Sequence, residues 1–206
     1  TLASSPAGEP ASRSHPILVA ASLQAPRLVR TISGHTNAVN AVTIALDNAT
    51  LISGSTDSTV KVWNLQTGEL MRTLSGNLKV NALFVSPDGN TLVSSGSDKT
   101  VKFWRLSDGE LLRTLSGFQG VVRSVAISPD GQTLATGNLD SSIGLWNLNN
   151  GNSITTLTGH GDFVTAVAFS RDGQTLISGG AGRDRSIKFW DLTKGQVIRS
   201  INGHPD

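Results

Sequence analysis

Histidine, serine and aspartate recur together in this sequence, and these three side chains make up a Ser-His-Asp catalytic triad. The set occurs twice, as His35, Ser53 and Asp57 and again as His160, Ser178 and Asp184. A nucleophile is expected once in a chain, whereas a structural arrangement recurs with the repeat that produces it. We therefore interpret both sets as structural and expect no catalytic residue and no enzyme activity.

The sequence offers no metal or phosphate site of recognised spacing. His35, His160 and His204 hold equivalent positions of a repeat, so they cannot meet around one ion, and there is no cysteine to supply thiolate ligands or disulfides. The stretch Gly179-Gly180-Ala181-Gly182 has the composition of a phosphate loop but lacks the helix that such a loop precedes. We expect no metal and no cofactor.

Composition narrows the class of protein. The 206 residues include 22 Gly and 5% aromatics, which suits many short strands joined by tight turns. The net charge of +2 and the absence of tyrosine argue against a nucleic-acid partner. Since no long apolar run or signal peptide is visible, we expect no membrane segment and a cytoplasmic location.

A repeat is the main signal in the chain. Trp63, Trp104, Trp146 and Trp190 are separated by 41, 42 and 44 residues. A second set of markers keeps the same register, because Val39, Val80, Val122 and Val164 precede these tryptophans by 24, 24, 24 and 26 residues. A period of this size indicates an array of supersecondary units.

Each period predicts four strands. Alternating segments such as Val125-Ala126-Ile127 open the unit, and turns such as Ser86-Pro87-Asp88-Gly89 follow them. The third strand ends at the tryptophan, and a glycine turn leads to a fourth strand such as Glu110 to Leu115. A four-stranded antiparallel sheet buries its faces by stacking on copies of itself, so the sequence predicts an all-β fold, a β-propeller of four blades.

Two of the units are similar to the Gly-His to Trp-Asp repeat of the WD40 family. They run from Gly34-His35 to Trp63-Asn64 and from Gly159-His160 to Trp190-Asp191, and the resemblance extends over residues 27–204. The repeat units are expected at about 34–75, 76–116, 117–158 and 159–202 within a WD40 region spanning 17–206. Residues 1–16, rich in Ala, Ser and Pro, are expected to form a disordered linker, and residues 17–23 remain unassigned.

The resemblance implies a hydrogen-bonded structural network in each repeat. Its members would be His35, Ser53, Asp57 and Trp63; Ser94, Asp98 and Trp104; Thr136, Asp140 and Trp146; and His160, Ser178, Asp184 and Trp190. The middle repeats carry Asn77 and Phe118 in place of histidine. We expect burial of Asp98 or Asp140 without its partner to cost about 1–3 kcal/mol unless water or backbone compensates.

The resemblance also implies a face for partners, where the first strand of each repeat begins. The candidate residues are Asn40, Asn81, Arg123 and Thr165, then Thr56, Ser97, Leu139 and Arg183, with Phe118 and Phe163 adding apolar contact. The function predicted is a protein-interaction scaffold or docking module that binds other proteins or peptides. The rival hypothesis is a hydrolase-type propeller enzyme with a site in the central channel.

The two ends of the array do not match. Arg27 to Ile32 repeats the fourth-strand pattern and predicts a seventeenth strand, while Gly203-His204 starts a further repeat. Together with Thr1 at the first position, this favours an excerpt of a longer propeller. The alternatives are two copies that complete a ring and, less favoured, a closed ring of four blades.

Overall fold

The computed structural model describes residues 27–203. Residues 32–203 belong to one compact unit, and residues 27–31 fall outside it. The linker expected at 1–16, the unassigned segment 17–23 and His204 lie outside the described residues. No helix in the described part of the chain is long and apolar enough to cross a membrane.

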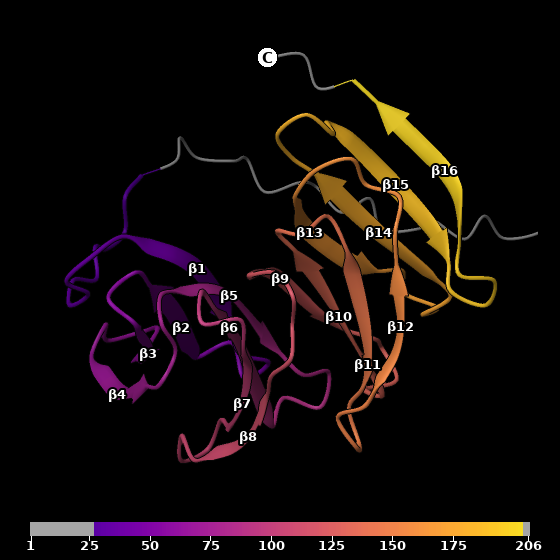
Figure 1. The fold of residues 1–206 in the computed structure, drawn as a ribbon. Coiled ribbons are helices and arrows are strands. Elements are labelled where there is room, and N and C mark those ends of the chain that lie inside the picture. The colour runs from indigo at the N-terminus through magenta and orange to yellow at the C-terminus, as the bar shows by residue number, and fades with distance from the viewer. Residues whose placement is uncertain (1–26, 204–206) are drawn as a thin grey trace, which may run out of the picture. The chain divides into compact units, whose positions relative to one another are not determined.

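Residues 32–203 form sixteen strands in four antiparallel sheets, and within each sheet the strands are hydrogen-bonded in sequence order (Figure 1). Blade 1 contains β1 (Val39–Ile44), β2 (Thr50–Ser55), β3 (Thr59–Asn64) and β4 (Leu70–Ser75), and blade 2 contains β5 (Val80–Val85), β6 (Thr91–Gly96), β7 (Val101–Arg105) and β8 (Leu111–Leu115). Blade 3 contains β9 (Val122–Ile127), β10 (Thr133–Asn138), β11 (Ile143–Asn147) and β12 (Ser153–Leu157), and blade 4 contains β13 (Val164–Phe169), β14 (Thr175–Gly180), β15 (Ser186–Asp191) and β16 (Gln196–Asn202). The predicted all-β fold of four four-stranded blades is confirmed.

The turn between the first two strands of each blade needs a residue with positive φ. Gly89, Gly131 and Gly173 supply it with φ of 74°, 72° and 71°. In blade 1 the same place is taken by Asn48 at φ 54°, a residue that tolerates this region better than most. All four blades therefore have a residue with positive φ at this turn.

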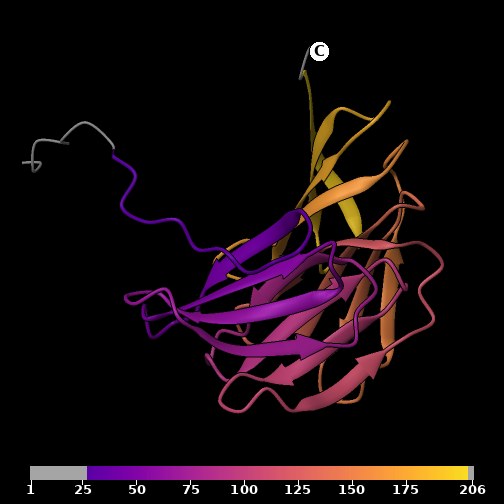
Figure 2. The same cartoon turned by 90° about the vertical axis from the view of Figure 1, so that its left-hand side faces the viewer.

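Neighbouring blades pack through apolar faces, and the first strands β1, β5, β9 and β13 lie side by side in that order (Figure 1). Figure 2 views the four sheets from the side of blade 1. Between blades 1 and 2, Ile52, Val60 and Leu74 pack against Val80 and Leu92. Equivalent positions form the clusters between blades 2 and 3 and between blades 3 and 4. The core is thus a series of inter-blade interfaces, as expected when a sheet buries its faces against copies of itself.

The outward face of blade 1 has no such neighbour within residues 32–203. Val42 on β1 is 66% exposed, whereas the equivalent Val125 on β9 is 5% exposed. On the opposite end face, Ile201 of β16 is exposed although the equivalent Leu157 is buried. Large apolar side chains on both end faces mean that the array is open and that each end could receive another blade.

The predicted seventeenth strand does not form. Arg27 to Ile32 carry the outer-strand pattern, yet residues 27–35 contain no strand. An outer strand must pair with the third strand of a blade, and in blade 4 that strand, β15, already pairs with β16. A segment with the side-chain pattern of an outer strand forms a strand only where another strand has an unpaired edge.

Candidate functional site

Blade 4 contains a chain of hydrogen bonds that begins at its tryptophan. The Nε1–H group of Trp190 donates to Ser178 Oγ over 2.8 Å, and Ser178 Oγ lies 2.6 Å from His160 Nε2. The Nδ1 atom of the same ring lies 2.6 Å from Asp184 Oδ2. Because a carboxylate only accepts, His160 donates from Nδ1, and Nε2 accepts the serine proton. One ring thus joins β14 to the loop before β15.

Blade 1 repeats this arrangement. His35 Nδ1 lies 2.7 Å from Asp57 Oδ2, and His35 Nε2 lies 2.7 Å from Ser53 Oγ. Trp63 donates to the same serine oxygen over 2.8 Å. The two complete sets of residues therefore form the same network in both end blades.

The electrostatics of these networks follow from burial and hydrogen bonding. Burial lowers the pKa of His160 and outweighs the nearby Asp184 carboxylate, which raises it, so the ring is held neutral. Burial alone would raise the pKa of Asp57, but hydrogen bonds from Thr59, His35 and the Thr36 backbone outweigh it and hold the pKa well below its usual range. The blade 4 network is therefore a neutral imidazole that donates to a carboxylate.

The geometry resembles a catalytic triad, but the serine is not available as a nucleophile. Ser178 is 1% exposed, and its oxygen already accepts a hydrogen bond from Trp190. Ser53 in blade 1 is likewise buried and bonded to Trp63. A nucleophile must reach its substrate. The arrangement therefore supports a structural role for both sets.

Blade 2 satisfies its aspartate with a residue that the sequence pattern did not identify. Ser94 Oγ donates to Asn77 Oδ1 over 2.7 Å and accepts from Trp104 over 2.8 Å. Asp98 is contacted by the ammonium of Lys102, which lies 3.1 Å from Oδ2. The backbone compensation expected for Asp98 is present, because the Thr100 N–H donates to its Oδ1 over 3.2 Å. Lys102, two strand positions before the tryptophan, adds an ion pair that the sequence reading did not foresee.

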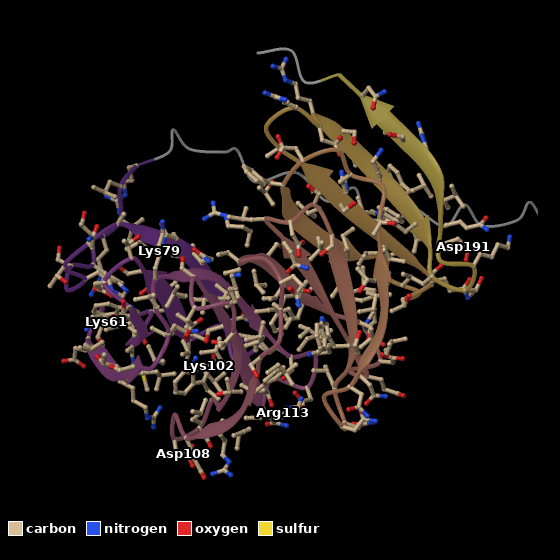
Figure 3. The ribbon with its side chains drawn as sticks, viewed as in Figure 1. Lys61, Lys79, Lys102, Asp108, Arg113 and Asp191 are labelled. Atoms are coloured by element: carbon tan, nitrogen blue, oxygen red, sulfur yellow. The ribbon has the colours of Figure 1, made fainter. Side chains whose placement is uncertain are left out.

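The repeat pattern contains a feature that could have identified Lys102 as a partner of Asp98. The position opposite the network serine or threonine on the third strand is Lys61, Lys102, Gly144 and Lys188 in blades 1 to 4. Lys61 and Lys102 are labelled in Figure 3. Where histidine is present, the lysine turns to a cross-strand hydroxyl, as Lys61 does to Thr73. Where histidine is missing, Lys102 turns inward instead.

Blade 3 has neither the histidine nor the lysine. The Phe118 ring packs on Trp146 with ring centroids 4.5 Å apart. The indole Nε1 of Trp146 lies 3.4 Å from Thr136 Oγ1, a long hydrogen bond. Asp140 is exposed and is bonded through Oδ1 to the backbone and hydroxyl of Ser142. An aromatic pair therefore takes the place of the polar network.

The residues predicted to face partners lie in a row where the first strands begin. Asn40 donates from Nδ2 to Thr56 Oγ1 over 3.0 Å and to the Val80 carbonyl of the next blade over 2.8 Å. Asn81 repeats the second bond with the Val122 carbonyl over 3.1 Å. The two asparagines therefore also join neighbouring blades, a role that the sequence reading did not foresee.

The structure separates the candidates that a partner could reach from those that it could not. Phe118 is 7% exposed and packs in the core, so it is corrected from a contact residue to a buried one, and Asn81 is also buried. Phe163 is 44% exposed. The other exposed candidates are Asn40, Arg123, Thr165 and Arg183, while Thr56, Ser97 and Leu139 are half-buried.

The loops of blade 4 hold two of the exposed candidates in place. Asp162 accepts hydrogen bonds from the backbone N–H groups of Phe163 and Arg183 over 2.8 and 3.0 Å. These bonds lower the pKa of Asp162, with the Arg183 backbone as the main cause. The glycine-rich stretch that lengthens this blade therefore forms a loop tied to the loop before β13.

The comparisons agree with this fold. The family described as WD domain, G-beta repeat matches residues 26–64, 68–105, 109–147 and 151–191. The chain belongs to the WD40 repeat family.

Curated relatives match over short stretches. The chain is 47% identical over 53 residues to the pre-mRNA-splicing factor PRP46 of Eremothecium gossypii and, with the same figures, to that of Saccharomyces cerevisiae. It is 40% identical over 48 residues to the nuclear distribution protein PAC1 of Tuber melanosporum. The matches cover 25% of this chain and 12% of each PRP46 protein, and 23% and 11% for PAC1. A match of this length spans little more than one repeat, so it shows only that the repeats are similar in sequence.

Proposed function

We propose that this chain is a protein-interaction scaffold and that it binds its partner at the face where the first strands of the blades begin. The observation that carries the proposal is the row of exposed, chemically different side chains on one repeated frame. Asn40, Arg123 and Thr165 occupy equivalent places there, and Phe163 and Arg183 are held nearby through their backbone bonds to Asp162. A rigid frame with variable side chains is how repeat proteins gain specificity.

The chemistry of this face favours an acidic partner with an apolar anchor. Arg123 and Arg183 supply two guanidinium groups, and Phe163 supplies an exposed ring. Arginine and aromatic residues are enriched among the side chains that dominate binding energy. The names of the relatives do not extend this proposal, because each match covers about one repeat.

The test compares two variants in affinity capture followed by quantitative mass spectrometry. Arg123→Ala with Phe163→Ala is expected to lose at least about tenfold of any specifically captured protein, in keeping with two anchor residues. Arg171→Ala with Leu112→Ala removes the same kinds of side chain away from this face and is expected to have no effect. Equal capture by the first variant and the wild-type chain would contradict the proposal.

The exposed end faces support a second part of the proposal, namely that each binds a further blade of the same kind. Two sources remain: more repeats of one longer polypeptide, or a second copy of this chain. Val42 is an exposed apolar side chain on β1, on the outward face of blade 1. If copies associate, light scattering will show a dimer that Val42→Glu dissociates. A monomer at about 100 μM would contradict association of copies.

The compartment is a prediction only. The sequence predicts a cytoplasmic protein, and the described fold is compatible with that location. Imaging of a fluorescent fusion in the source cell would check it.

A further inference from the structure

Blade 3 contains a hollow of about 400 Å³ at the place where the other blades carry their polar network. Its lining includes Phe118, Asn138, Asp140, Gly144, Trp146 and Thr156. All of its lining residues lie in blade 3 or in the loop that leads into it. The hollow therefore lies within one repeat and not between blades.

Two glycines show how the hollow arises. In blade 2, a Cβ atom on Gly76 would meet the ring edge of Trp104 at 3.5 Å and the stem of Lys102 at 3.6 Å. At the equivalent Gly117 of blade 3, a Cβ atom would meet nothing within 4 Å. The ring edge and the lysine stem that occupy this space in blade 2 are thus both missing from it in blade 3.

The third strand of blade 3, β11, explains why the lysine stem and the tryptophan ring edge are missing from this space. Gly144 stands where blade 2 has Lys102, so no stem enters from β11. The indole of Trp146 has moved over this glycine, because a Cβ atom on Gly144 would lie 2.5 Å from Trp146 Nε1. The space beneath Gly117 is left open by both changes.

Two side-chain oxygens that line the hollow receive no hydrogen bond from residues 27–203. Asn138 is 4% exposed, and its Oδ1 has no hydrogen-bond partner among the described residues. Asp140 uses Oδ1 for Ser142, but its Oδ2, which in blades 1 and 4 would accept from histidine, receives no hydrogen bond in residues 27–203. A buried acceptor with no donor is costly, so a ligand that donates to Asn138 Oδ1 would gain there, and the exposed Asp140 carboxylate adds a negative charge beside it.

We propose that this hollow is a binding site for an alkylammonium group, the side chain of a lysine presented by a partner. The chain itself shows such an occupant in the equivalent place, since the stem of Lys102 passes Gly76 and Trp104 and its ammonium contacts Asp98. In blade 3 the ammonium would meet Asp140 and Asn138. Its stem would lie against Phe118 and Trp146, whose rings attract a cation.

Among residues 27–203, no lysine or arginine lines the hollow. Lys99 is the lysine bonded to the loop beside it, and its ammonium donates to the Gln119 carbonyl over 2.7 Å. Lys99 does not line the hollow. The site therefore calls for a donor from outside blade 3.

The site is separate from the proposed partner face. It uses none of the exposed candidates on that face, and its test uses a small molecule in place of a protein. Either proposal can therefore fail while the other holds.

The experiment is an NMR titration of the 206-residue chain with n-butylammonium chloride at constant ionic strength. The four indole N–H signals, one from each blade, are assigned with single Trp→Phe variants. We expect the Trp146 signal to shift with half-saturation on the order of millimolar, as suits so small a ligand, while the other three stay in place. Uncharged n-butanol of equal length is expected to leave the Trp146 signal unchanged.

Asp140→Asn keeps the oxygen that bonds Ser142 and removes only the charge, so the turn is expected to remain folded. It should weaken n-butylammonium binding about tenfold, the scale of a hydrogen bond to a charged group. Asp172→Asn, which removes a carboxylate from an exposed turn, serves as the matched control and should bind as the wild type does. The proposal is overturned if butanol is as effective, if all four indole signals move together, if no signal moves, or if Asp140→Asn binds normally.

Discussion

Blades 3 and 4 have the same strand order, yet a polar network fills blade 4 at the place where blade 3 has two aromatic rings and a hollow. In blade 4, His160 links Ser178 to Asp184. In blade 3, Phe118 packs on Trp146, and Asp140 is turned to Ser142. Both blades pack through buried apolar faces toward their neighbours.

Comparing blades 3 and 4 shows which interactions form a blade and which are contributed only by the histidine network. The four strands and their register are the same with and without histidine. The network instead fixes the tryptophan, which lies under its Gly-His turn in blade 4 and over Gly144 in blade 3. We infer that sheet pairing and inter-blade packing form the fold, and that the network determines local order within it.

Replacing the two tryptophans should give the largest effect and the clearest contrast. Trp190→Ala removes a side chain that is 1% exposed, and it is expected to lower the free energy of unfolding by about 3–5 kcal/mol. Trp146→Ala should cost at least about 1 kcal/mol less, because this ring is half-buried and already borders a hollow. Urea unfolding followed by circular dichroism measures both. Equal losses would remove the distinction between the blades.

Breaking the network at its histidine should have the next largest effect. His160→Ala leaves the Asp184 carboxylate and the Ser178 hydroxyl without a shared partner, and it is expected to cost about 1–3 kcal/mol. Asn77→Ala in blade 2 should be nearly neutral, since it loses one bond from Ser94 but also removes a buried nitrogen without a partner. The same urea measurement applies, and a larger loss from Asn77→Ala would reverse our ranking of the two networks.

Removing the blade 2 lysine tests whether it substitutes for histidine. Lys102→Met keeps the apolar stem and deletes the ammonium near Asp98, and we expect a loss of about 1–2 kcal/mol because the pair is largely shielded. Lys61→Met is the matched control. Its ammonium bonds only the exposed Thr73, so the change should stay below about 0.5 kcal/mol in urea unfolding. Similar effects of the two substitutions would show that the inward turn of Lys102 contributes nothing.

The smallest effect expected is a pH dependence from blade 4. Burial lowers the pKa of His160 below its ordinary value of 6.5, so the unfolded chain binds this proton more readily than the folded one. The stabilising contribution is therefore complete above about pH 6.5 and is lost as the pH falls below it, by no more than about 1.4 kcal/mol per pH unit. Unfolding measured from pH 7.5 to 5.5 checks this. His160→Gln should flatten the curve, and an unchanged slope would contradict the assignment.

Much of the fold could be predicted from the repeat. The tryptophan and valine markers placed all four sheets, and the Asp-Gly turns predicted the positive φ of Gly89, Gly131 and Gly173. The candidate site was only partly predictable. Arg123 and Phe163 are exposed as expected, but Phe118 is in the core. An aromatic residue at a loop position carries no sign of whether it faces solvent or a neighbouring tryptophan.

The sequence by itself determined the four blades of this chain and their strand order, because strand periodicity, turn residues and repeat spacing are local properties of the chain. The resemblance to the WD40 repeat implied the two complete histidine networks. Only the tertiary structure decided that Arg27 to Ile32 forms no strand, that Lys102 turns inward to Asp98 and that blade 3 keeps a hollow. Each of these depends on which partners are within reach in space. A strand needs an open edge, a lysine needs a carboxylate without its histidine, and a hollow exists only when all the neighbouring side chains leave it unfilled.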